Sequence, residues 1–207
     1  MNFPYYKGNL TNNYLVMINI IVLRLATGVS MDEVYIPAER AALLKADKKG
    51  IRKLEKLCSC KLKFRGANEI IIEGDGAFEE YTAKNVIYAF GRGFGIDVAA
   101  KLTHPDYYFS SIDISEFTRN KNRIREIRAR LIGTNGRTKR YIEVVSSAKV
   151  SIFGDTISFI GKSDCIEEAE TAANAIIDGR SHRLAYNKME AAHRKNRERR
   201  REGVEEA

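Results

Sequence analysis

The stretch that decides the fold is Leu131-Ile132-Gly133-Thr134-Asn135-Gly136-Arg137-Thr138-Lys139-Arg140. A Gly-x-x-Gly loop here separates two segments whose apolar residues recur at helical spacing. Glycines let the main chain come close to a bulky ligand, and the start of a helix directs free N–H groups toward an anion. Arg137, Lys139 and Arg140 add positive charge at the same place. We therefore predict a loop that binds nucleic-acid phosphate, the alternative being an ordinary turn between two helices.

The positive charge of the chain is concentrated in two zones. The sequence has 207 residues, enough for one large or two small domains, and a net charge of +8. Residues 119–140 hold nine Arg/Lys and one acid, and residues 180–201 hold nine Arg/Lys and two acids, so the remainder is net acidic. This clustering favours a nucleic-acid partner, whereas the alternative is two solvated helix faces.

The three cysteines predict no metal site. Cys58 and Cys60 are separated by one residue, and neither a histidine nor a second cysteine pair lies near them in the sequence. We expect small buried thiols at these positions and at Cys165, in a reducing, cytoplasmic setting. No metal and no cofactor is expected.

The first thirty residues differ in character from the rest. The stretch from Tyr14 to Ala26 is mostly apolar, but it is shorter than the ~20 residues that span a bilayer. It lacks a small-residue cleavage site of the kind that ends a signal peptide. We expect translation to start at Met31, residues 1–30 to be an extension, and the protein to make no membrane contact.

The second half of the chain predicts a compact α+β unit over residues 111–180. A strand at 111–114 is followed by a helix that ends at the glycine loop, and a second helix covers 137–146. Two short strands meet at Gly154-Asp155, and a helix from Ser163 to Asp178 ends before Gly179. The predicted order is strand, helix, loop, helix, strand, strand, helix.

A shift of 88 residues superimposes an earlier part of the chain on this pattern. Residues 43–55 align with 131–143, and residues 61–64 align with 149–152. A fixed offset of this kind predicts two copies of one unit. The first copy covers 31–95, and its loop, Lys45 to Lys48, lacks both glycines. Residues 96–110 are predicted as a linker helix and turn, and 181–207 as a basic C-terminal tail. This tail either binds RNA phosphates without sequence preference or is a disordered arm that orders on contact.

These residues resemble a family. The element order and the loop from Gly133 to Gly136 are similar to a KH domain of the eukaryotic type. The closer resemblance is to the partner-of-Nob family of ribosome-assembly factors, in its short archaeal form. It rests on a degenerate first copy followed by Gly91-Arg92-Gly93-Phe94, Asp106-Tyr107-Tyr108, Ile112-Asp113-Ile114, Gly136-Arg137-Thr138-Lys139 and Ile142-Glu143. Thr134 stands where the eukaryotic loop usually has lysine, which lowers the expected charge of the loop.

The resemblance implies both fold and function. It implies two tandem type I KH domains (βααββα), each a three-stranded antiparallel sheet packed on three helices. It also implies binding to single-stranded rRNA at the 3′ end of the small-subunit RNA, during maturation of that subunit. The implied partners are an assembly endonuclease that trims this end and a translation initiation factor.

We expect the RNA site to lie between the glycine loop, its flanking helices and the strand at 150–153. Glycines would admit the backbone, short polar residues would reach phosphate oxygens, and cations would attract the strand. Ile132 and Ile152 would form an apolar floor for bases, with core packing as the equal alternative, and one of Arg128 and Arg130 would touch RNA. The full set of expected RNA-binding residues is Arg128, Arg130, Ile132, Gly133, Thr134, Asn135, Gly136, Arg137, Lys139, Arg140 and Ile152.

Two questions stay open at the level of sequence. The first copy is either a protein-docking domain, which we favour, or a weak RNA binder through Lys45, Lys48 and Lys49. The whole chain is either an RNA-binding assembly factor or a protein-interaction adaptor with incidental RNA contacts. An enzyme is not expected, because Gly91-x-Gly93-x-Gly95 lacks the spacing of a dinucleotide loop and no nucleophile constellation surrounds the histidines.

Overall fold

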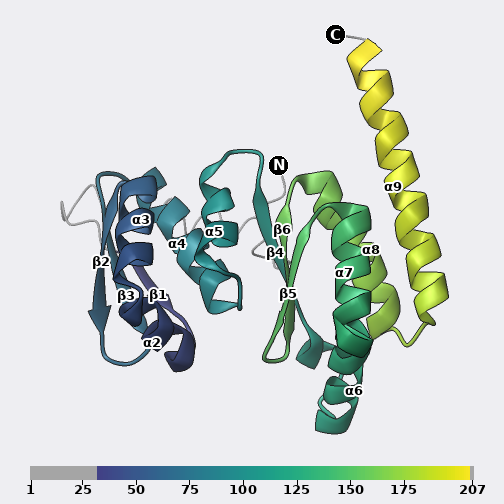
Figure 1. Cartoon of the computed structure of the whole chain (residues 1–207), viewed down its shortest axis with the longest axis horizontal. Helices are drawn as coiled ribbons and strands as arrows, with labels where there is room; N and C mark the ends of the chain where they lie inside the picture. Colours follow the sequence, from purple (N-terminus) through teal and green to yellow (C-terminus); the bar gives the residue numbers. More distant parts are fainter. Residues whose placement is uncertain (1–31, 206–207) are drawn as a thin grey trace, which may run out of the picture. The chain divides into compact units, whose positions relative to one another are not determined.

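The structure, a computed structural model, describes residues 32–205. The chain divides between Thr103 and His104 into two units, each with its own three-stranded antiparallel sheet and helices (Figure 1). The fold is therefore of the α+β class. The extension at 1–30 and the start at Met31 lie outside the described residues.

The first unit follows the order β-α-α-β-β-α. Its elements are β1 (Asp32–Tyr35), α2 (Ala38–Ala46), α3 (Lys48–Cys58), β2 (Cys60–Arg65), β3 (Glu69–Gly74) and α4 (Ala77–Gly91), then α5 (Ile96–Ala99) and the 3-10 turn η1 (Ala100–Thr103). The sheet order is β1-β3-β2, with Ile70 opposite both Val34 and Phe64. Helices α3 and α4 pack against this sheet.

The second unit repeats that order and adds a helix. Its elements are β4 (Tyr108–Asp113), the 3-10 turn η2 (Ile114–Glu116), α6 (Lys121–Ile132), the 3-10 turn η3 (Thr134–Gly136), α7 (Arg137–Ser146), β5 (Lys149–Phe153), β6 (Thr156–Gly161), α8 (Ser163–Ile177) and α9 (His182–Glu205). The sheet order is β4-β6-β5, so the strand nearest the predicted groove is an edge strand. The first strand begins at Tyr108, three residues earlier than the polar–apolar alternation predicted.

Apolar residues at helical and strand spacing build the core of the second unit. Ile127 and Leu131 of α6, Ile142 of α7, and Ile157 and Phe159 of β6 are at most 1% exposed. They meet alanines and isoleucines of α8, which packs over β4 and β6. Burial of such side chains contributes about 1.5–3 kcal/mol each relative to exposure, and it holds the glycine loop at the end of a rigid helix pair.

The offset of 88 residues holds in three dimensions. Gly50, Leu54 and Cys58 form the buried face of α3, and their counterparts Thr138, Ile142 and Ser146 form the buried face of α7. A side-chain contact repeats as well. The Leu62 N–H donates to Glu55 Oε1 at 3.0 Å, and the Val150 N–H donates to Glu143 Oε1 at 3.0 Å.

The C-terminal segment is more ordered than a polar tail. Residues 182–205 form the helix α9, which packs against α7 and α8 and, in Figure 1, extends past their ends. The physical reason is a narrow inner face, on which Ala185 and Met189 are fully buried and Asn196 is 2% exposed. Because this segment is rich in arginine, its composition alone does not reveal the buried face.

Two smaller expectations concern the cysteines and the membrane. Cys58 and Cys60 are buried, as expected, while Cys165 is half-buried. A hydrogen bond from the Cys60 thiol lowers the pKa of Cys58, and the same bond raises that of Cys60. Within residues 32–205, no helix is both long and apolar enough to cross a bilayer.

Candidate nucleic-acid interface

Gly133 is the residue that permits the loop. Its φ of 72° and ψ of 169° lie in a region that is essentially restricted to glycine. A Cβ added there would lie 2.7 Å from the Thr138 nitrogen and 2.3 Å from Thr138 Oγ1. The loop backbone therefore folds tightly onto the first turn of α7, which leaves no room for any side chain at position 133.

Gly136 has a different role in the same loop. Its φ is 73°, but a Cβ there would meet nothing closer than Arg140 Nη1 at 3.7 Å, so the space above it is open. Asn135 also has a positive φ, of 52°, a conformation that asparagine tolerates better than most residues. The loop thus presents main chain and short polar side chains to solvent on its outer side.

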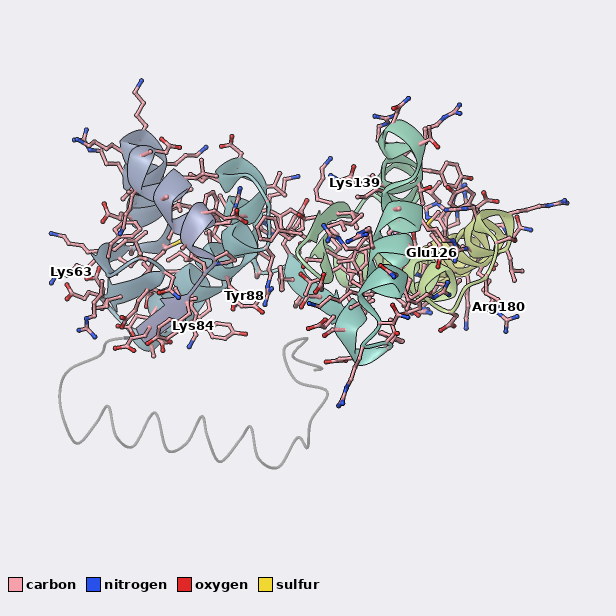
Figure 2. All side chains as sticks on the ribbon, turned by 90° about the horizontal axis from the view of Figure 1, so that it is seen from below. Lys63, Lys84, Tyr88, Glu126, Lys139 and Arg180 are labelled. Carbon is pink, nitrogen blue, oxygen red and sulfur yellow. The ribbon has the colours of Figure 1, made fainter. Side chains whose placement is uncertain are left out.

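The start of α7 has the features that favour an anion. Among residues 32–205, no side chain caps this helix at its Gly136 N-cap. Arg137 and Arg140 are exposed and Lys139 is half-buried (Lys139 is labelled in Figure 2). No carboxylate of the described residues forms an ion pair with these three cations. Free N–H groups and unpaired cations together favour a bound phosphate.

The groove side of α6 carries Arg128. Its guanidinium lies 3.8 Å from Asp155 Oδ1, in the turn that joins β5 and β6. The Arg128 Nε is buried and has no hydrogen-bond partner among the described residues. Arg128 therefore links α6 to the β5–β6 turn, at the edge of the predicted groove.

The two isoleucines proposed as a floor differ in exposure. Ile132 is 38% exposed at the end of α6. Ile152 on β5 is half-buried and packs against the core of the second unit. Both are accessible in part, so contact with a base stays a prediction for each.

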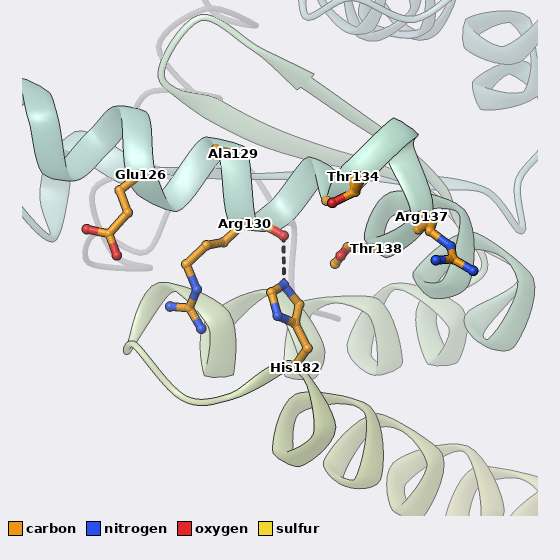
Figure 3. A pocket seen from close by; sticks show the side chains of 8 residues that line it. Glu126, Ala129, Arg130, Thr134, Arg137, Thr138 and His182 are labelled. Carbon is orange, nitrogen blue, oxygen red and sulfur yellow. Dashed lines mark hydrogen bonds between the residues drawn. The ribbon is translucent and has the colours of Figure 1, made fainter.

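Arg130 occupies a different place from Arg128. Its Nη1 donates to the Ile176 carbonyl at 3.0 Å, and its Nη2 donates to the Arg180 carbonyl. The His182 Nε2 donates to the Arg130 carbonyl at 2.9 Å, the dashed line in Figure 3. Arg130 thus ties α6 to the end of α8, which favours Arg128 as the RNA-contacting member of the pair.

Helix α9 contacts the first turns of α7, next to the loop, which the sequence alone did not predict. The Tyr186 hydroxyl donates to Thr138 Oγ1 at 3.3 Å, and its ring lies 4.3 Å from that of Tyr141. The Tyr141 hydroxyl donates to Glu190, and this hydrogen bond raises the pKa of Tyr141. The only available signal is the spacing of Tyr186 and Glu190, four residues apart on one helix face.

A pocket lies between the loop and the start of α9 (Figure 3). Its walls come from the end of α6, the loop, the first turn of α7 and the first residue of α9. Lining it are Glu126, Ala129, Arg130, Gly133, Thr134, Arg137, Thr138 and His182. Within residues 32–205 there is no group of three or more His, Cys, Asp or Glu side chains that could hold a metal ion.

Comparison with known proteins places this geometry in a family. Residues 108–194 match the model of the second KH domain of the partner-of-Nob family, a eukaryotic-type KH domain (KH-domain type I). A KH domain-containing protein of Methanocaldococcus jannaschii is 30% identical over 171 residues, which are 80% of this chain and 75% of the relative. The chain belongs to the partner-of-Nob family. The matched region includes the first half of α9.

Solved structures agree with the partner-of-Nob assignment. Dim2p from Pyrococcus horikoshii is 29% identical with a TM-score of 0.70, covering 78% of this chain and 99% of that one. A chain in the crystal structure of an a/eIF2alpha–aDim2p–rRNA complex from the same organism is 27% identical with a TM-score of 0.74, covering 83% and 98%. A protein of unknown function from Aeropyrum pernix, 20% identical with a TM-score of 0.79 over 85% and 97%, shares the fold.

Proposed function

We propose that this partner-of-Nob protein binds single-stranded RNA through its Gly133–Gly136 loop during maturation of the small ribosomal subunit. The proposed target is the 3′ end of the small-subunit rRNA. The observation that carries the proposal is the uncapped start of α7 beside a glycine loop and unpaired cations. The similarity to a chain from an rRNA-containing complex supports rRNA as the ligand.

The loop and its neighbours divide the work of binding. Gly133 and Gly136 let the sugar-phosphate backbone approach the main chain, and Thr134 and Asn135 offer short polar groups to phosphate oxygens. A KH loop of this kind clamps about four nucleotides. We assign long-range attraction and charge-assisted hydrogen bonds to the cations Arg128, Arg137, Lys139 and Arg140, and the apolar floor to Ile132 and Ile152.

We further propose that the first unit is a second, degenerate KH domain that docks proteins. It has the element order and sheet order of the second unit, which supports a tandem repeat. Among the described residues of this unit, Tyr35, Leu43, Leu57 and Phe78 are exposed large apolar side chains. Two cations of this unit, Lys63 and Lys84, are paired with Glu73 and Asp32 and so are less available to RNA (Figure 2).

The proposed partners follow from this division of roles. The complex that contains a/eIF2alpha supports a translation initiation factor as a protein partner, and we propose an rRNA-trimming endonuclease as another. We expect the protein to act in the cytoplasm. It would act by binding alone, without catalysis, cofactor or metal, because the loop, its cations and its apolar residues all serve to hold RNA.

The proposal is tested by placing a carboxylate where phosphate is expected. An aspartate side chain at position 136 would enter open space, and aspartate tolerates the left-handed backbone there. We therefore expect the fold of the Gly136→Asp variant to survive. A matched control is Gly66→Asp in the first unit, because Gly66 also has a positive φ (62°) and open space. We expect Gly136→Asp to weaken binding of single-stranded RNA by more than tenfold, about 1.4 kcal/mol, and Gly66→Asp to leave it unchanged.

The opposite result would favour the adaptor function. If Gly136→Asp binds single-stranded RNA as tightly as the wild type, the loop is not the RNA site. Retained binding of a protein partner in both variants would then identify protein interaction as the main role. Gly133→Asp is unsuited to this test, because the close approach to Thr138 would disturb the fold as well as the ligand.

A further inference from the structure

Helix α9 contacts the second unit at points between His182 and Arg200. Ala185 and Met189 are fully buried in its first half. Tyr186 and Glu190 contact α7 through Thr138 and Tyr141. These contacts set both the position of α9 and its rotation about its own axis.

A buried carboxylate fixes the second half of the same helix. Glu168 of α8 is fully buried, and its oxygens lie 2.8 Å from His193 Nδ1 and 3.1 Å from Asn196 Nδ2. Arg200 adds contacts to Glu168 at 3.6 Å and to Asp164 at 3.5 Å. Because a buried carboxylate is costly without partners, this cluster holds the arginine-rich end of α9 in one orientation.

Exposed arginines lie along one edge of α9. Arg194, Arg197 and Arg201 follow Glu190 by four, seven and eleven residues, so they lie on the same edge of the helix as Glu190, toward α7. All three are exposed. In the part of the chain that the structure describes, Arg200 is the only arginine of this stretch in an ion pair. We call Arg194, Arg197 and Arg201 the arginine edge.

The arginine edge continues the direction of α7 away from the glycine loop. Tyr186 pairs with Thr138 and Glu190 with Tyr141, so the two helices run in the same direction from the loop. At 1.5 Å of rise per residue, Arg194 lies about 12 Å and Arg201 about 22 Å beyond the level of Tyr186. A longer strand would pass this edge if it leaves the roughly four nucleotides held by the loop in the direction of α7.

We propose that the arginine edge of α9 is a second RNA-contacting surface, which holds backbone phosphates of the strand outside the nucleotides clamped by the loop. This inference rests on the proposed function. Arginine forks bind phosphate oxygens in pairs and read no base. The edge therefore adds affinity that grows with RNA length and carries no sequence preference. Its fixed orientation means that α9 contributes contacts without first having to fold.

The test compares two edges of one helix in the full-length protein. Arg194, Arg197 and Arg201 are changed together to alanine. The matched control changes Lys188, Lys195 and Arg199 to alanine, which removes the same charge. These three residues are exposed, and their spacings of seven and four residues place them on a different edge of the helix. Affinity is measured for single strands of about 5 and about 16 nucleotides at several salt concentrations. Circular dichroism verifies that both variants keep their helix content.

We expect the arginine-edge variant to bind the long RNA about tenfold more weakly, with a salt dependence reduced by about two in the slope of log K against log salt. Its affinity for the short RNA should equal that of the wild type, and the control should lose less than about threefold. Equal losses in both variants, or no loss in either, would overturn the arginine edge as a defined surface.

The outcome separates this inference from the proposed function. If Gly136→Asp abolishes short-RNA binding while the arginine-edge variant keeps full affinity for long RNA, only the present inference fails. If the wild type binds no short RNA and Gly136→Asp changes nothing, the loop assignment fails. A length-dependent loss in the arginine-edge variant would still support the edge in that case.

Discussion

The joint between the two helices is built differently in the two units. In the first unit, Asp47 alone separates α2 from α3, and its Oδ1 accepts a hydrogen bond from the Gly50 N–H at 2.8 Å. In the second unit, four residues with two glycines separate α6 from α7, and no side chain within the described range caps α7. A carboxylate thus occupies in one unit the position that the other leaves open to phosphate.

The start of the second helix thus differs between the units, while the fold around it is the same. Both units keep the sheet order, the buried helix faces and the carboxylate contact to the following strand. Asp47 satisfies the helix start from within and repels phosphate by its charge. The first unit is therefore free to serve another purpose, which agrees with the docking role that we propose.

The largest expected effect concerns the glycine that has no counterpart in the first unit. Gly133→Ala should lower the free energy of unfolding of the second unit by about 3 kcal/mol, because of the glycine-only backbone and the contact with Thr138. Lys45→Ala, at the equivalent position, should cost less than about 1 kcal/mol. Urea unfolding of the full chain measures both, and similar losses would contradict the contrast drawn between the joints.

The next effect concerns the cations beside the open helix start. Changing Arg137, Lys139 and Arg140 together to alanine should weaken single-stranded RNA binding by more than tenfold, about 1.4 kcal/mol. The salt slope should fall by about two, because about three phosphate contacts are lost. Filter binding at several salt concentrations measures both quantities. A smaller loss without a change of slope would place the RNA elsewhere.

A smaller effect tests the internal cap. Asp47→Ala should destabilise the first unit by about 1 kcal/mol, because the start of α3 loses its acceptor. Asp47→Asn keeps an acceptor and should cost only a few tenths of a kcal/mol. Thermal or urea unfolding gives the comparison. Equal stability of the two variants would show that the cap is unimportant to α3.

The smallest effect tests the first unit as an RNA binder. Changing Lys45, Lys48 and Lys49 to alanine should alter RNA affinity by less than about twofold, within the range of screened surface charge. Lys45 already donates to the Gly66 carbonyl at 2.7 Å. A loss of more than about tenfold would show that this unit binds RNA and would end its assignment as a docking domain.

Much of this architecture was predictable from local pattern. Helix 137–146 has the predicted bounds, because Tyr141, Ile142 and Val145 fall at helical spacing and pack on the core. Thr138 and Ser146, which are polar, complete its buried face. The 88-residue offset aligns residues that are buried in both units, such as Leu54 and Ile142. It extends to Glu80 and Glu168, two fully buried carboxylates that the sequence analysis did not single out.

The rest depended on contacts between distant segments. Arg128 and Arg130 are neighbours on one helix, yet one faces the β5–β6 turn and the other bonds carbonyls near the end of α8. Their roles follow from what packs on each side, which spacing alone does not encode. The same holds for α9, whose inner face relies on two apolar residues and on polar partners for Glu168.

The burial of Glu168 against α9 has a consequence for C-terminal truncation of this protein. Removal of the residues after 180 would take away His193, Asn196 and Arg200 together and strand an interior negative charge. Such a loss of partners costs about 3–5 kcal/mol in other proteins, enough to unfold a small domain. A shortened chain that no longer binds RNA would therefore report misfolding, whereas substitutions on the outer surface of the last helix can assign it a role.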